Sequence, residues 1–200
     1  MIHYATPYSL VGDVGQAYNE FMRLLPNDDD FAGLLDGDAM FSTHHFGHHI
    51  AECVRANPDC GYFCCCANRL NSKWQTVGQA AFVSDSLKYH RQLGTQFWDR
   101  HGAECVDVAD RTPRAAGVLM VVRKSEWRRV GGFTETTNPD KPNLLSVDAD
   151  YHRAFVRHGL PIKMMLGVYV IHWFRGAQSM GPFKGPTGHL TEHYQADCTR

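Results

Sequence analysis

The segment LLDGDAMF, residues 34–41, is the most informative part of the chain, because an apolar run that begins at Phe31 stops there at two acids. A short apolar run that ends at turn residues is typical of a buried strand. Asp36 and Asp38 then follow the strand's carboxyl end, where open α/β sheets bind ligands. Carboxylate oxygens in that position suit Mg²⁺ or Mn²⁺, which commonly bridge to phosphate. A solvated Asp-Gly turn would have the same sequence, so the choice between a metal site and a turn depends on the rest of the chain.

Composition excludes several classes of protein. The 200 residues are enough for one domain with its own core, and seven cysteines, an odd number, favour thiols over a disulfide framework. A formal net charge of -1 predicts no general basic surface for nucleic acid. No run of about 18 apolar residues predicts a membrane span, and the N-terminus lacks the features of a signal peptide. We therefore expect a cytoplasmic protein.

Periodicity and capping residues predict alternating strands and helices in the first half of the chain. The expected elements are a strand from residue 2 to a loop at Pro7, a helix over 14–25 capped by Asp13, the strand ending at Asp36, a helix from Ser42 or Thr43 to about 56, a strand over 61–69 ending in Asn68 and Arg69, an irregular connection over 71–83, a helix from Ser84 or Asp85 to about 101, and a strand over 104–108.

The second half adds a strand over 117–122, a turn of helix over 125–130 that stops at two glycines, and a helix over 146–159 capped by Ser146. Val147, Tyr151 and Phe155 form the apolar stripe of that last helix. Asp148 and Asp150 fall in its first turn, where the helix dipole stabilises carboxylates with or without catalysis. Two extended pieces, 161–166 and 168–172, end at His172.

Cysteine and histidine clusters offer a different chemistry. Cys64 and Cys66 share one face of the expected strand, and Cys60 could join them in a zinc site, although small buried hydrophobes explain them as well. Four histidines on the helix after residue 43 have chelating spacing of four residues but no glutamate between them in the HExxH manner. They are His44, His45, His48 and His49.

The order of these pieces resembles the GT-A nucleotide-sugar glycosyltransferases. The DGD tip, the VGGF turn, the helix VDADYHRAFVRHG and the terminal IHWFR occur in that family's order. The likeness is nearest to the inverting family two and to polypeptide sugar transferases, in a small bacterial or phage type. It implies an α/β fold: a single GT-A, Rossmann-like domain over 1–176, with a mixed, mostly parallel central sheet flanked by helices. Residues 1–110 would bind the nucleotide sugar, 111–176 would carry the acceptor and catalytic half, and the Gly- and Pro-rich 177–200 would form a tail or lid.

The resemblance also implies roles for single residues. Asp36 and Asp38 match the metal-binding DxD motif, with Asp38 the direct ligand and Asp36 nearer the ribose or a metal-bound water. His172 matches the late histidine that completes the metal site, and Asp148 matches the general base of inverting members. The remaining matches are Gly117 beside the donor sugar and Thr6 and Pro7 beside the base and ribose.

Two features depart from the family pattern. Val147 stands where the family usually has the Glu of an ED motif. The chain also lacks a strand and a helix that members usually have before the DxD strand, which affects how the base would be gripped.

The implied activity is metal-dependent transfer from a nucleoside diphosphate sugar, preferably a UDP-sugar, with Mn²⁺ or Mg²⁺. Arg175 and Lys184 would clamp phosphate, and Trp173 and Phe174 would stack on a ring or pack in the core. The acceptor would be a glycan or, through a local basic strip, hydroxymethylated DNA. That strip comprises Arg111, Arg114, Arg123, Lys124, Arg128 and Arg129. Two alternatives stay open: a non-catalytic nucleotide- or sugar-binding module of the same fold, and a zinc-dependent hydrolase built on the histidines and cysteines.

Overall fold

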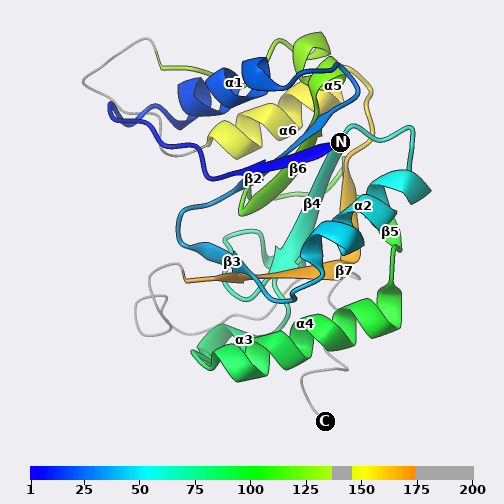
Figure 1. The fold of residues 1–200 in the computed structure, drawn as a ribbon. Helices are drawn as coiled ribbons and strands as arrows, with labels where there is room; N and C mark the ends of the chain where they lie inside the picture. The colour runs from blue at the N-terminus through cyan, green and yellow to red at the C-terminus, as the bar shows by residue number, and fades with distance from the viewer. Residues whose placement is uncertain (137–145, 174–200) are drawn as a thin grey trace. The chain divides into compact units, whose positions relative to one another are not determined.

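The computed structural model describes residues 1–136 and 146–173 (Figure 1). The chain divides into two compact units, and each draws on three stretches of sequence. Unit 1 comprises Met1–Gly37, Pro58–Cys64 and Asp107–Lys163. Unit 2 comprises Asp38–Asn57, Cys65–Val106 and the chain from Met164 onward. The chain leaves unit 1 directly after Gly37, so the two acids of the DGD stretch belong to different units.

Unit 1 contains strands β1 (Ile2–Ala5), β2 (Phe31–Leu35), β6 (Leu119–Arg123) and the first residues of β4 (Tyr62–Ala67). Strand β1 runs parallel to β2, with Ala5 opposite Leu34, and β6 runs antiparallel to both β2 and β4. The helices of this unit are α1 (Val14–Leu24), α5 (Lys124–Arg129) and α6 (Val147–Arg157). The parallel pairing brings the ends of β1 and β2 to the same edge.

Local signals explain most of these elements. The Asp13 carboxylate accepts the Gln16 N–H at 3.0 Å, which confirms the predicted cap of α1. Tyr151 and Phe155 of α6 are buried, as the apolar stripe predicted. The predicted Ser146 cap is wrong: the serine adopts φ 76° and its side chain makes no capping hydrogen bond. Its backbone, in the left-handed region, cannot present the hydroxyl as an ordinary N-cap does.

Unit 2 contains β3 (Ala39–Phe41), the end of β4 and β7 (Lys163–His172), with β5 (Cys105–Asp107) beside β7. Its helical elements are α2 (Phe46–Ala56), a 3₁₀ turn η1 (Lys73–Gln75), α3 (Gln79–Val83) and α4 (Leu87–His101). Strand β3 pairs antiparallel with β7 and places Ala39 opposite His172. That pairing places Asp38, the residue before β3, at the end of β7.

Four expectations for unit 2 are corrected. The two extended pieces after residue 160 form one continuous strand, β7. Gly167, inside this strand, lets the Gly102 backbone come close, because a Cβ on residue 167 would lie 2.2 Å from the Gly102 carbonyl oxygen. Helix α2 begins at Phe46, because the Ser42 hydroxyl donates to the Tyr169 carbonyl at 2.6 Å instead of capping. Ser86 caps α4, and the connection expected to be irregular contains η1 and α3.

The predicted class, an α/β fold with a mixed sheet flanked by helices, is confirmed. Parallel pairing is less common than we expected: of the four ladders with a described register, only β1 with β2 is parallel. Within the described residues, no helix is both long and apolar enough to cross a membrane.

Candidate metal centre

Asp38 and His172 lie side by side in unit 2, although 134 positions separate them in the chain. Their Oδ1 and Nε2 atoms are 3.1 Å apart, and the Trp173 N–H donates to the Asp38 carbonyl at 2.8 Å. The His172 side chain is only 9% exposed, whereas that of Asp38 is 51% exposed. The pair is therefore anchored in the protein on the histidine side and open to ligands on the carboxylate side.

The hydrogen bonds of His172 determine which of its nitrogens can bind a cation. Its Nδ1 lies 2.6 Å from the carbonyl oxygen of Arg69, which only accepts, so Nδ1 carries the proton and donates. In the neutral ring the Nε2 lone pair then points at the Asp38 carboxylate, and two acceptors face each other. A cation between them, either a proton or a metal ion, removes that repulsion. Metal-binding histidines commonly donate their second N–H to a carbonyl in this way.

The separation of the two atoms also fits a metal ion. Two ligand atoms about 2.1 Å from one ion, at right angles in an octahedral site, lie about 3 Å apart. The observed 3.1 Å between Nε2 and Oδ1 agrees with that geometry. Asp36 is joined to Asp38 through a single glycine, so its Cα stays within about 7 Å along the chain. Chain connectivity alone therefore keeps Asp36 near Asp38.

Asp36 has its own surroundings in unit 1. Its N–H donates to the Val118 carbonyl at 3.1 Å, which holds the strand end beside β6. The Tyr18 hydroxyl of α1 hydrogen-bonds to the Asp36 side chain, and the pKa of Tyr18 is raised by burial and then by the charges of Asp36 and Asp148. Tyr18 therefore lies close to two of the predicted site residues. Sequence reasoning missed it because it fits the apolar stripe of α1.

Asp148, the predicted base, is positioned by Gly117 in unit 1. The Gly117 N–H donates to its Oδ2 at 2.8 Å, and the Ala149 N–H donates to Oδ1 at 2.7 Å. A Cβ on residue 117 would lie 2.8 Å from the Asp148 Cβ, so only glycine fits there without a shift. The resemblance places Gly117 beside the donor sugar, and the structure adds that its backbone N–H orients the Asp148 carboxylate.

The other predicted residues are placed less fully. Thr6 is exposed just after β1, and a Cβ built on Gly37 would lie 3.7 Å from its methyl carbon. Pro7 is half-buried beside it. Phe174, Arg175, Lys184 and the expected tail over 177–200 lie outside the described residues.

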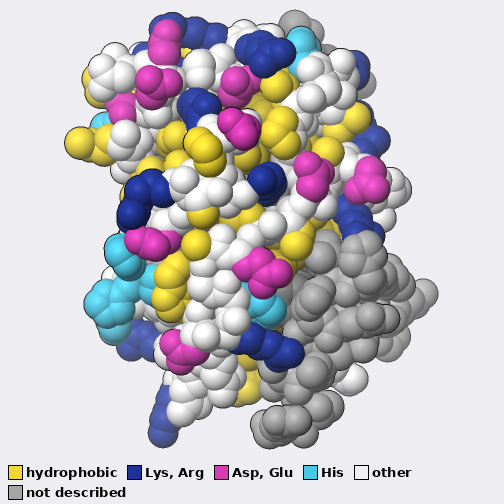
Figure 2. Space-filling view, turned by 90° about the vertical axis from the view of Figure 1, so that its right-hand side faces the viewer, with side chains coloured by type: hydrophobic (Ala, Val, Ile, Leu, Met, Phe, Trp, Pro, Cys, Tyr) yellow, Lys and Arg dark blue, Asp and Glu magenta, His cyan; other side chains and the backbone are white. Residues whose placement is uncertain are grey.

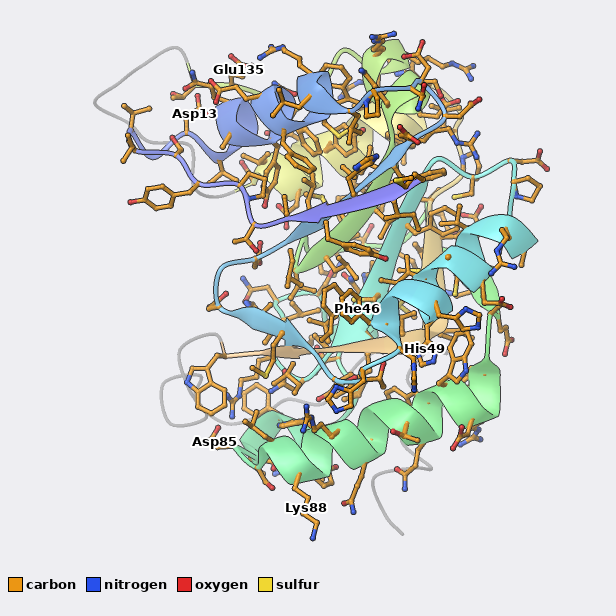
Figure 3. The ribbon with its side chains drawn as sticks, viewed as in Figure 1. Asp13, Phe46, His49, Asp85, Lys88 and Glu135 are labelled. Atoms are coloured by element: carbon orange, nitrogen blue, oxygen red, sulfur yellow. The ribbon has the colours of Figure 1, made fainter. Side chains whose placement is uncertain are left out.

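The cysteines and the histidines of α2 do not form metal sites of their own in the described part of the chain. Cys60, Cys64 and Cys66 are fully buried, and no group of three metal-binding side chains collects around them or around α2. His49 stacks flat on Trp98 of α4, with ring centroids 3.7 Å apart, and burial lowers the pKa of this histidine (Figure 3). Three of the four histidines line a hollow of about 240 Å³ beside α4. These rings are therefore explained by packing and a polar pocket.

The basic strip is largely occupied by contacts within unit 1. The Lys124 ammonium is buried and donates to the Leu25 carbonyl, and Arg128 pairs with Asp28 at 2.5 Å. Arg123 donates to the carbonyls of Pro58 and Cys60. Figure 2 shows acidic and basic side chains interspersed over the face it presents. These contacts give no support to a continuous basic surface.

No protein-family model, no curated protein and no solved structure matches this chain. The function has to be inferred from the chemistry of the site itself.

Proposed function

We propose that this chain is a metal-dependent glycosyltransferase that moves a sugar from a nucleoside diphosphate sugar to an acceptor hydroxyl. The observation that carries the proposal is the Asp38–His172 pair, with Nε2 facing Oδ1 at 3.1 Å and Nδ1 bound to a carbonyl. The second support is the resemblance of the chain's motifs, in their order, to GT-A enzymes. UDP-sugars are the preferred donors under this proposal, and the single GT-A domain is part of it.

Asp38 and His172 would hold a Mn²⁺ or Mg²⁺ ion, with Asp36 as a third ligand or as a partner of a bound water. When bound, the ion would supply Lewis-acid stabilisation of the negative charge on the departing diphosphate. His172 contributes a fixed orientation, because its ring is buried and its Nδ1–H is bound to Arg69. Asp38 contributes an accessible carboxylate.

Asp148 would take the proton from the acceptor hydroxyl as general base. The hydrogen bond from Gly117 fixes the orientation of this carboxylate, and its second oxygen receives the N–H of the next residue. General-base assistance typically contributes about 10²–10⁴ in rate. The proposal therefore predicts that removing this carboxylate slows the transfer while donor binding persists.

The experiment is a panel of nucleotide sugars with Mn²⁺, in which release of the nucleoside diphosphate is measured by mass spectrometry with candidate glycan acceptors. Asp38→Asn and His172→Gln should abolish metal-dependent release. Asp148→Asn should still bind UDP with Mn²⁺. It should form nucleoside diphosphate from the nucleotide sugar about 10²–10⁴ times more slowly than the wild type.

Asp150→Asn is the matched control for the base. Asp150 lies in the same first turn of α6, but it pairs with Arg153 on the surface. Its substitution should leave release unchanged. If Asp148→Asn keeps wild-type release, Asp148 is not the base. If the wild type binds Mn²⁺ with UDP but consumes no donor, the chain is a binding module.

A further inference from the structure

We propose that Asn68 and Arg69, at the end of β4, bind phosphate oxygens of the diphosphate in the site that Asp38 and His172 begin. This inference rests on the proposed function for the identity of the ligand. All four residues belong to unit 2, and they are joined by direct contacts. Asn68 and Arg69 would supply the donors that recognise the anion.

The Arg69 side chain is fully buried but incompletely hydrogen-bonded. Its Nε donates to the Phe82 carbonyl at 2.8 Å, and its Nη2 donates to Ser84 at 3.2 Å and to Asp85 at 2.5 Å. Within residues 1–136 and 146–173, its Nη1 is buried and has no acceptor. A buried donor on a charged group without an acceptor destabilises the protein, because the group has lost its water and gained no hydrogen bond in exchange. The native site therefore gains from an oxygen at this position.

Asn68 repeats the pattern one residue earlier. Its Oδ1 accepts the His172 N–H at 2.7 Å. This bond fixes the orientation of the amide, with Nδ2 directed away from that N–H. That Nδ2 is buried and also lacks an acceptor among the described side chains and backbone. Two neighbouring residues thus each bury a donor without a partner, and both contact His172.

The type of ligand follows from charge. The two free donors need an acceptor with several oxygens, and one of the donors belongs to a guanidinium, which prefers phosphate or carboxylate. The Asp38–His172 pair, which contacts the Asn68 amide oxygen and the Arg69 carbonyl through His172, calls for a cation. A diphosphate satisfies both requirements, because its oxygens accept hydrogen bonds and also bind a divalent ion. The Trp173 ring, 5.9 Å from the guanidinium carbon, covers another side of the arginine.

The test compares Arg69→Lys and Asn68→Asp with the wild type by calorimetric titration. The probes are Mn²⁺ alone, then UDP, UMP and uridine in the presence of Mn²⁺. Arg69→Lys keeps the charge but loses the guanidinium donors. Asn68→Asp keeps the oxygen that accepts from His172 and replaces only the free donor by an oxygen. Both variants should bind UDP about ten- to hundredfold more weakly, and uridine without change.

The Mn²⁺ titration separates a folded variant from a misfolded one. Arg69→Lys should bind Mn²⁺ as the wild type does, and Asn68→Asp at least as tightly, since it adds a carboxylate. Asn71→Asp and Arg91→Lys are the matched controls, because they make the same changes at exposed positions of unit 2. Both controls should bind UDP like the wild type.

The inference would be overturned if Asn68→Asp bound UDP as tightly as the wild type, or if the wild type did not bind UDP. The two free donors would then be hydrogen-bonded to buried water. UDP binding that depends on Asn68 and Arg69, without consumption of any nucleotide sugar, would keep the anion site and reject the transferase. Transfer that proceeds with unchanged UDP affinity in both variants would reject the anion site alone.

Discussion

Asn19 of α1 offers a sharp test of the packing in unit 1, because its buried amide uses both of its ends. Its Oδ1 accepts from Trp127 Nε1 at 2.8 Å and from the Phe133 N–H at 2.9 Å. Its Nδ2 donates to the Phe133 carbonyl at 2.9 Å and to Glu135 at 2.7 Å. The side chain therefore joins α1 to α5 and to the segment that follows it (Figure 3 labels Glu135).

Asn19→Leu conserves the approximate volume and removes all four bonds. Two buried donors, on Trp127 and Phe133, then lose their acceptor at about 1–3 kcal/mol each. The expected loss of unfolding free energy is about 2–6 kcal/mol, a large share of the roughly 5–15 kcal/mol typical of a domain. Urea denaturation measures this loss, and the slope of the unfolding free energy against urea concentration should stay unchanged. The melting temperature should fall by about 4–20 °C.

Gln16→Ala is the control for this prediction. Gln16 lies on the same helix, and its amide makes one exposed hydrogen bond, to Glu20 at 3.0 Å. Its loss should change the unfolding free energy by no more than about 0.5 kcal/mol. If Asn19→Leu is equally mild, the amide does not hold these segments together and the description of the α1–α5 contact is wrong.

Two further predictions concern unit 1. Gly117→Ala should lower the unfolding free energy by about 1–3 kcal/mol in a urea titration, because the new methyl would lie 2.8 Å from the Asp148 Cβ; an unchanged midpoint would contradict the close contact. Stability should also fall as the pH drops from about 7.5 to about 5.5. The His152 Nδ1 accepts from the Ala115 N–H and its Nε2 donates to the Ala109 carbonyl, and burial lowers its pKa from 6.5. Below pH 6.5 His152 binds a proton in the unfolded chain but stays neutral in the folded chain. Its contribution to the unfolding free energy is therefore complete above pH 6.5 and is lost as the pH falls toward the lower pKa of the folded state. Nuclear magnetic resonance titration of His152 together with thermal melting checks this, and a native-state pKa above 6.5 would refute it.

Local signals in the sequence predicted much of the architecture. The Asp13 cap, the apolar run of β2 and the stripe of α6 depend on residues within a few positions of one another, so spacing alone reveals them. The errors lie where distant backbone intervenes. Ser42 is a good capping residue, but its hydroxyl donates to the Tyr169 carbonyl instead. Gly167 separates the two extended pieces that the sequence predicts, but in the structure it lies within one continuous strand and lets the Gly102 backbone come close.

For the candidate site, residue types and their order already indicated the possible ligands: two carboxylates after a buried strand and a histidine after another. Tertiary packing brings Asp38 and His172 together, because the β3–β7 register places Ala39 opposite His172 across more than a hundred residues. It also decided that Arg69 and Asn68 bury free donors beside them, since the partners of these side chains come from distant segments of the chain. Pairing and burial of this kind depend on which segments pack together, and no local pattern of residues records that.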